Sequence, residues 1–114
     1  MRVLVCGGRS YEDWGTISKT LKAVGPTVLI QGGAPGADRL AQKWAEHNAV
    51  PVVTYPANWN AGKKGGPMRN AFMLTDSRPD IVVAFPGGAG TADMIRRAET
   101  AGVPVRMTFN AEER

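Results

Sequence analysis

Three short apolar runs in this chain each break into a Gly-Gly pair, and a helical pattern follows each pair. The runs, at residues 3–6, 28–31 and 81–85, are nearly continuous in apolar side chains. Such runs are typical of parallel strands that helices cover on both faces. Glycines directly after a strand let several backbone N–H groups converge on one point, and a following helix adds partial positive charge there. The pattern therefore predicts an α/β chain with a composite anion site at the strand ends.

Apolar runs and helical stripes alternate along the whole chain, and this alternation predicts the fold. We expect five strands, at residues 2–6, 27–31, 51–55, 80–85 and 103–108. Pro67 near a first turn favours a short helix over residues 66–77. The order predicts an α/β, doubly wound, five-stranded parallel sheet with strand order 3-2-1-4-5, folded as a single domain over residues 1–114. Such sheets bind ligands at the carboxyl ends of their strands.

The composition restricts the class of protein. Apolar residues make up 43% of the 114 and charged residues 21%, which is ordinary for a globular domain. Cys6 is the only cysteine, which excludes a disulfide framework and fits a reducing cytoplasm. His47 is the only histidine, so Cys/His zinc chemistry and a Ser-His-Asp triad lack the spacing they need. No apolar run approaches the ~20 residues of a membrane span and no signal-peptide pattern opens the chain, so we expect no membrane partner.

The chain carries a formal net charge of +4, from 14 basic and 10 acidic residues. That excess suits a pocket for phosphates and also a nucleic-acid surface. The basic residues are scattered and form no block of like charges, so nucleic acid is the less favoured partner. A small sheet with exposed Trp or Met on a helix would gain from self-association, so a homo-oligomer is one of the states we consider.

The three Gly-rich turns supply the candidate ligand-binding residues. In the last turn, donors that we expect to hold a phosphate are Gly87, Gly88, Gly90 and Thr91. The glycines that we expect to shape the ribose and base side are Gly7, Gly8, Gly32 and Gly33, and we expect Gly36 to face the ligand as well. Arg9 is either a phosphate ligand or a surface arginine, and Asp38 is either a helix-start carboxylate or a contact to a ribose or base. No metal motif is present, although Mg²⁺ could arrive with a phosphate ligand.

Residues 56–66 form the longest irregular stretch, which is polar, glycine-rich and basic with one aromatic ring, Trp59. Two interpretations stay open: a mobile lid whose Trp59 stacks on a base, and a solvated connector that Trp59 pins to the protein. Elsewhere we expect Trp14, Trp44 and the methionines to lie in the core, with Cys6 as a small core residue.

Four segments of this chain together resemble the SLOG superfamily, named for the SMF/DprA and lonely-guy proteins, and within it the small YspA/YpsA-like branch. The segments are residues 3–9, 31–38, 66–70 and 86–91. The last of them, Pro-Gly-Gly-Ala-Gly-Thr between a buried strand and a helix, is the most specific. The resemblance covers nearly the whole chain and implies a Rossmann-like fold that binds nucleotides or nucleotide-derived ligands.

The lonely-guy enzymes of this superfamily hydrolyse the N-glycosidic bond of nucleoside 5′-monophosphates, using an Arg that opens a helix and a Glu three residues after the Thr. The resemblance places this Arg at Arg69, with Asn70 where those enzymes have Lys, and Asn70 is a further candidate ligand-binding residue. The position of the Glu is Met94, and the nearby carboxylate, Asp93, lies about 100° around the helix from it. Arg69 and Asp93 are therefore the candidate catalytic pair.

The missing Glu sets the order of the functional hypotheses. Glycosidic cleavage passes through a cationic sugar, which a carboxylate aimed at the ribose stabilises. We therefore expect first a sensing or binding module for a nucleotide or phosphoribosyl-containing small molecule. The second hypothesis is a nucleoside 5′-monophosphate phosphoribohydrolase, and the third is a single-stranded nucleic-acid binder like the DprA relatives.

Overall fold

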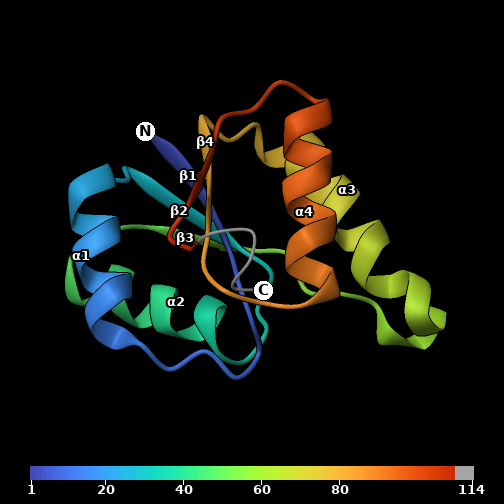
Figure 1. The fold of residues 1–114 in the computed structure, drawn as a ribbon, viewed down its shortest axis with the longest axis horizontal. Helices are drawn as coiled ribbons and strands as arrows, with labels where there is room; N and C mark the ends of the chain where they lie inside the picture. The colour runs from blue at the N-terminus through green and yellow to red at the C-terminus, as the bar shows by residue number, and fades with distance from the viewer. Residues whose placement is uncertain (110–114) are drawn as a thin grey trace.

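The computed structural model describes residues 1–109, which form one sheet with helices on both sides (Figure 1). The strands are β1 (Arg2–Cys6), β2 (Val28–Gln31), β3 (Val52–Thr54), β4 (Ile81–Ala84) and β5 (Val105–Met107). The helices are α1 (Trp14–Val24), α2 (Ala37–His47), the 3-10 helix η1 (Trp59–Lys64), α3 (Gly65–Ser77) and α4 (Ala89–Thr100). None of the helices within residues 1–109 combines the length and apolar content that crossing a bilayer requires.

All strand pairs are parallel, in the order β3-β2-β1-β4-β5. This confirms the predicted fold class and strand order. In the register, Val3 of β1 pairs with Leu29 of β2 on one side and with Ile81 of β4 on the other. The strand order therefore reverses between β1 and β4. The turns that follow these two strands meet at the carboxyl end of the sheet.

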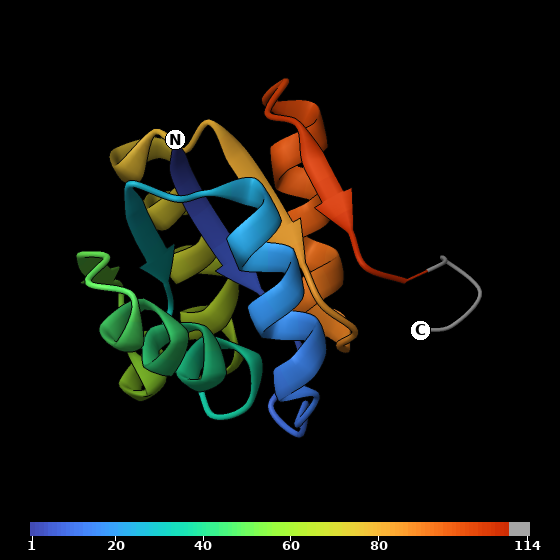
Figure 2. The same ribbon diagram turned by 90° about the vertical axis from the view of Figure 1, so that its left-hand side faces the viewer.

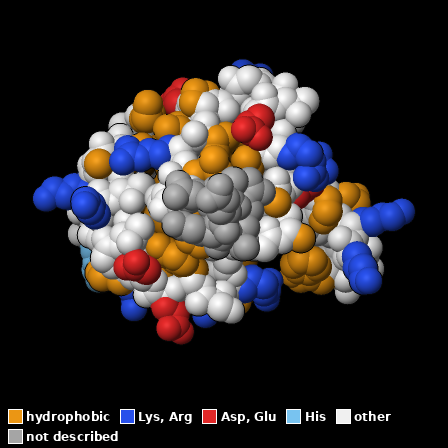
Figure 3. Space-filling view, viewed as in Figure 1, with side chains coloured by type: hydrophobic (Ala, Val, Ile, Leu, Met, Phe, Trp, Pro, Cys, Tyr) orange, Lys and Arg blue, Asp and Glu red, His pale blue; other side chains and the backbone are white. Residues whose placement is uncertain are grey.

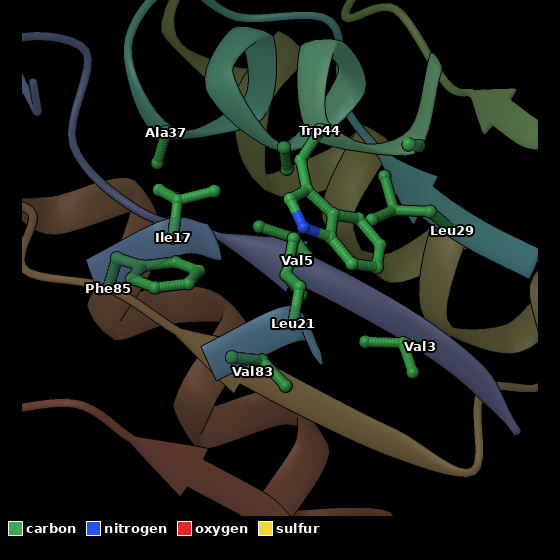
Figure 4. Close-up of a cluster of buried hydrophobic side chains, with 11 residues drawn as sticks. Val3, Val5, Ile17, Leu21, Leu29, Ala37, Trp44, Val83 and Phe85 are labelled. Atoms are coloured by element: carbon green, nitrogen blue, oxygen red, sulfur yellow. The ribbon is translucent and has the colours of Figure 1, made fainter. Parts of the chain in front are cut away.

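Two apolar layers join the sheet to its helices, with α1 and α2 in front of the sheet in Figure 2 and α3 and α4 behind it. The front layer contains Ile17, Leu21 and Trp44, which pack against β1, β2 and β4 (Figure 4). The rear layer contains Met73 and Met94. Helices cover both faces of β1 and β4, and this burial explains why the sequences of these strands are nearly continuous apolar runs.

Part of the core prediction is wrong. Trp14, the first residue of α1, is 37% exposed and packs edge-on against His47, with the ring centroids 6.2 Å apart. Helical spacing places Trp14 in line with Ile17 and Leu21, but a side chain at a helix end has fewer neighbours to bury it. The exposed methionines are Met1, Met68 and Met107, whereas Trp44, Met73, Met94 and Cys6 are buried.

Residues 56–66 differ from the irregular loop that their composition predicts. Residues Trp59–Lys64 form η1, and α3 begins directly after it at Gly65, one residue earlier than predicted. The 3-10 helix is kinked at Gly62, whose φ of 69° lies in the left-handed region that favours glycine. Trp59 packs over the start of α3, where a Cβ built on Gly66 would lie 3.4 Å from the Trp59 ring. This segment therefore packs against the start of α3.

Candidate functional site

A cavity of about 670 Å³ opens at the carboxyl ends of β1 and β4, where the strand order reverses. Its wall comes from the turns after β1, β2 and β4, from η1, and from the first turns of α2, α3 and α4. Such a cavity follows from a parallel sheet, because strand ends and helix starts converge there. The predicted site residues that line it are Gly7, Gly8, Arg9, Asp38, Arg69, Asn70, Gly88, Gly90, Thr91 and Asp93.

The predicted ligand residues that do not line this cavity are Gly32, Gly33, Gly36 and Gly87. Gly36 has a φ of 80°, and a side chain on it would collide with the carbonyl oxygen of Gly8. Gly87 likewise leaves room for the hydroxyl of Thr91. These glycines let the turns approach one another, and the turn after β2 reaches the cavity through Ala34 and Asp38 instead.

The N-terminus of α4 faces the cavity. Its N-cap residue, Gly88, has no side chain that could accept hydrogen bonds from the first turn. The first bond of the helix joins the N–H of Ala92 to the carbonyl oxygen of Gly88 at 3.0 Å. The three preceding N–H groups, of Ala89, Gly90 and Thr91, therefore have no acceptor inside the helix. Gly88, Ala89, Gly90 and Thr91 line the cavity, and a Cβ built on Gly88 or Gly90 would meet nothing within 4 Å, so this turn is open to the cavity.

Arg69 holds three segments of the cavity wall together. Its Nη1 donates to the carbonyl oxygens of Gly32 at 2.8 Å and Tyr55 at 3.2 Å, which follow β2 and β3. Its Nε donates to Oδ1 of Asn70 at 3.0 Å. The guanidinium covers Gly32 so closely that any side chain there would collide with it. Burial lowers the pKa of Arg69, yet an arginine keeps its charge at neutral pH, so the cavity wall contains a fixed positive charge.

Asp38 is only 6% exposed and organises the turn after β2. Its Oδ2 accepts hydrogen bonds from the N–H groups of Gly32 at 3.1 Å and Ala34 at 3.2 Å. Burial raises the pKa of this carboxyl to about 6, against the lowering effect of the two N–H groups and of the charges on Arg69 and Arg9. Asp38 thus serves the local structure at the start of α2, and its Oδ1 is the atom left for a ligand.

Asp93 and Met94 point in different directions from α4. Asp93 lines the cavity, and its Oδ2 accepts from Asn70 Nδ2 at 3.0 Å and from Arg97 Nε at 2.9 Å. Its Oδ1 pairs with Arg96 at 2.8 Å. Burial raises the pKa of Asp93, but hydrogen bonds from Asn70 and Arg97 and the charges of both arginines outweigh it, so the pKa is lowered overall. Met94 is fully buried in the rear apolar layer, so the carboxylate that faces the cavity is Asp93.

Basic side chains outnumber carboxylates around the cavity. The lining cations are Arg9, Lys63, Arg69 and Arg96, and the lining carboxylates are Asp38 and Asp93. Sequence reasoning missed Lys63 and Arg96 as site residues. The signal for Lys63 is the basic composition of residues 56–66, and the signal for Arg96 is its position one helical turn after Asp93. Trp59 also lines the cavity, so its aromatic ring is available to a ligand.

The groups that the cavity presents are amide N–H groups, guanidinium and ammonium groups, carboxylates and one indole ring. Over the described residues 1–109, no cluster of three or more His, Cys, Asp or Glu side chains is arranged to hold a metal ion. Cys6 lines the cavity, but burial raises the pKa of its thiol far above its usual value, and the charge of Asp38 raises it further. The thiol is therefore protonated at neutral pH and is not a nucleophile.

The chain is similar to a known protein family and to a phage protein. The family model described as "YspA, cpYpsA-related SLOG family" matches residues 1–62, which include the turns after β1 and β2. The "Gene 61 protein" of Mycobacterium phage D29 is 36% identical over 118 residues, covering 91% of this chain and 93% of the phage protein. A match of that extent includes the turn before α4 as well.

Proposed function

Because the chain belongs to the YspA, cpYpsA-related SLOG family, we propose that it binds a nucleotide or another phosphoribosyl-containing small molecule as a sensing or binding module. The observation that carries this proposal is the open N-terminus of α4, where three N–H groups and two unobstructed glycines face the cavity. A phosphate there would accept hydrogen bonds from these N–H groups and from the Thr91 hydroxyl. The excess of basic side chains around the cavity favours the same negative charge.

The rest of the cavity suits a sugar and a base. Its volume of about 670 Å³ is typical of small-molecule sites, which range over roughly 300–1,000 Å³. Trp59 offers a ring on which a base could stack. Oδ1 of Asp38 can accept a hydrogen bond from a hydroxyl of the ribose. The guanidinium of Arg69 is already held by two carbonyl groups, so binding a ligand would not carry the entropy cost of fixing this side chain.

A thermal-shift panel of nucleoside mono- and diphosphates on the wild type and Gly88→Val tests this proposal. Gly88 lines the cavity and a Cβ there meets no protein atom within 4 Å, so the substitution adds bulk beside the proposed phosphate position without a collision of its Cβ with the protein. We expect at least one nucleotide to raise the Tm of the wild type, and this rise to disappear in Gly88→Val.

Gly15→Val is the matched control, because Gly15 is an exposed glycine of α1 whose added Cβ would meet only Asp13, at 3.5 Å. It should keep the full ligand-induced rise in Tm. Equal rises in the wild type and Gly88→Val would remove the phosphate site from α4. A wild type whose Tm responds to none of the nucleotides would contradict the proposed function itself.

Asp93 supports a second function, hydrolysis of the N-glycosidic bond of a nucleoside 5′-monophosphate. In this reaction water adds to the anomeric carbon, the base leaves with a proton and ribose 5-phosphate is formed. A carboxylate beside the sugar stabilises the cationic transition state, and Asp93 lines the cavity with a lowered pKa. Arg96 and Arg97, however, pair with its two oxygens and offset its charge, which is why binding without rapid turnover comes first.

Chromatographic detection of free base released from AMP and other monophosphates separates the two functions. We expect very slow or absent release by the wild type. Rapid release that Asp93→Asn lowers by roughly 10²–10³-fold would make hydrolysis the function. Glu99→Gln, which changes an exposed carboxylate on the same helix, is the control and should leave any release unchanged.

A further inference from the structure

An apolar surface lies on the outer side of α3, and nothing within residues 1–109 covers it. Met68 and Phe72 of α3 are 60% and 61% exposed, and Trp59 of η1, at the start of the same helix, is 59% exposed. Phe72 contacts Tyr55 edge-on, with the ring centroids 5.8 Å apart. We call these four residues the α3 surface. Exposed aromatic and methionine side chains grouped in this way are typical of protein–protein interfaces.

Charged residues extend the exposed row of α3 at both of its ends. Met68, Phe72 and Asp76 of α3 follow one another at four-residue spacing. Lys64, the N-cap residue of α3, precedes them at the same spacing and has helical backbone angles, so the four side chains form one ridge. All four are exposed. The ridge is basic at its start, apolar in its middle and acidic at its end, where Asp76 accepts a hydrogen bond from the hydroxyl of Tyr55 at 2.6 Å and keeps its negative charge exposed. Figure 3 shows basic side chains beside hydrophobic ones at the end of the molecule where η1 and the start of α3 lie.

We propose that the α3 surface binds the α3 surface of a second copy of this chain, in a two-fold dimer with the two α3 helices antiparallel. A two-fold axis opposite residue 70 places Met68 against Phe72 of the partner subunit and Lys64 against Asp76 of the partner subunit, because both pairs are symmetric about that position. Packing of four-residue ridges against each other is the commonest helix–helix arrangement. The ridge is therefore complementary to itself in both shape and charge.

The apolar middle and the charged ends have different roles in this dimer. Burial of the Met68 and Phe72 side chains supplies most of the affinity, because large apolar side chains at the centre of an interface dominate binding. The exposed Lys64–Asp76 pairs add little affinity, but they disfavour a parallel arrangement, which would place like charges together. Trp59 belongs to the α3 surface and also lines the cavity, so the second copy would lie beside the cavity.

Sedimentation equilibrium of the full chain over a wide concentration range tests this interface. We expect the wild type to dimerise and Phe72→Lys to raise the dimer Kd by roughly tenfold or more. The matched control is Met107→Lys, because Met107 is also exposed, at 40%, but lies on β5. This strand is the outer strand farthest from β3, after which Tyr55 of the α3 surface lies. It should leave the Kd unchanged. A wild type that stays monomeric, or a dimer that Phe72→Lys does not weaken more than Met107→Lys does, would overturn the proposal.

Exchange of the charges tests the antiparallel arrangement. Lys64→Asp and Asp76→Lys should each raise the dimer Kd, because each places like charges together at both ends of the ridge. The double variant restores opposite charges in the antiparallel pair, so its Kd should be lower than that of Asp76→Lys, which also lacks the hydrogen bond that Tyr55 donates to Asp76. Single variants that weaken the dimer without recovery in the double variant would overturn this arrangement. Far-UV circular dichroism checks that every variant is folded, and the outcome does not depend on nucleotide binding.

Discussion

The carboxyl of Asp38, in the cavity wall, makes the stability of the protein depend on pH. Burial raises its pKa to about 6 from the 3.8 of an exposed carboxyl. The native protein therefore holds this proton more tightly than the unfolded chain does. It follows that the contribution of Asp38 to stability is greatest below pH 3.8 and is lost as the pH rises through about 6. The difference between the two pKa values corresponds to ~3 kcal/mol, which is the free energy by which the native protein disfavours the ionised form of Asp38.

Asp38→Asn should remove this dependence on pH. The side-chain oxygen of Asn can still accept from Gly32 and Ala34, but it carries no charge that burial would penalise. We expect the free energy of unfolding of Asp38→Asn to exceed that of the wild type by ~3 kcal/mol at about pH 8, and the difference to shrink toward about pH 4. Urea unfolding across this range measures both. A difference that stays constant with pH would contradict the argument.

Met94 is the position at which the resemblance and the structure lead to opposite expectations. Introducing the Glu of the lonely-guy enzymes there would place a carboxylate in the rear apolar layer, away from the cavity. Because an unpaired buried charge costs roughly 3–5 kcal/mol, we expect Met94→Glu to lower the free energy of unfolding by that amount and to release no additional base. Chemical denaturation and the chromatographic assay measure these effects.

Met94→Leu keeps the apolar volume and should cost less than about 1.5 kcal/mol, so it separates the effect of charge from that of shape. A Met94→Glu protein that kept the stability of the wild type and released base faster would show that the side chain at position 94 can reach the cavity.

Among the elements, the turns after β2 and β3 depend on α3 through Arg69. We expect Arg69→Lys to lower the free energy of unfolding by roughly 1–3 kcal/mol, because an ammonium cannot reach both carbonyl groups and Asn70 at once. Arg39→Lys, on the exposed face of α2, is the control and should change stability little. Urea unfolding measures both variants, and equal stabilities would show that Arg69 does not join these segments.

The sequence predicts most elements because their signals are local. The alternation of apolar runs and helical stripes gives the strands to within two residues at each end, and Pro67 gives the start of α3 to within one residue, 66 against the observed 65. The 3-10 helix η1 could not be predicted, because its residues carry no apolar periodicity and none of them is buried. Its order comes from a tertiary contact, the packing of Trp59 over Gly66.

At the scale of the whole molecule, the net charge of +4 and the lining cations predict that ligand binding depends on salt. We expect the Kd of a nucleoside monophosphate to rise by roughly tenfold between about 0.05 and 0.5 M NaCl, because screening shortens the reach of exposed charges. Isothermal titration calorimetry measures the Kd. Arg9→Gln should reduce this dependence on salt.

The control for Arg9→Gln is Arg39→Gln, which also removes one positive charge but lies on an exposed face of α2 outside the cavity lining. If the two variants lost salt dependence equally, the net charge of the molecule would matter and the local charge of the cavity would not.

By itself the sequence determined the strands, the α-helices, the parallel sheet order and the meeting of three Gly-rich turns at the carboxyl end of the sheet. These features follow from apolar periodicity and from glycine, which act over a few neighbouring residues. Only the tertiary structure decided which side chains face the cavity. Asp93 faces it and Met94 does not, and Arg69 covers Gly32 while Lys63 and Arg96 join the wall. Those outcomes depend on the rotation of α4 and on contacts between segments far apart in the chain, which no local pattern encodes.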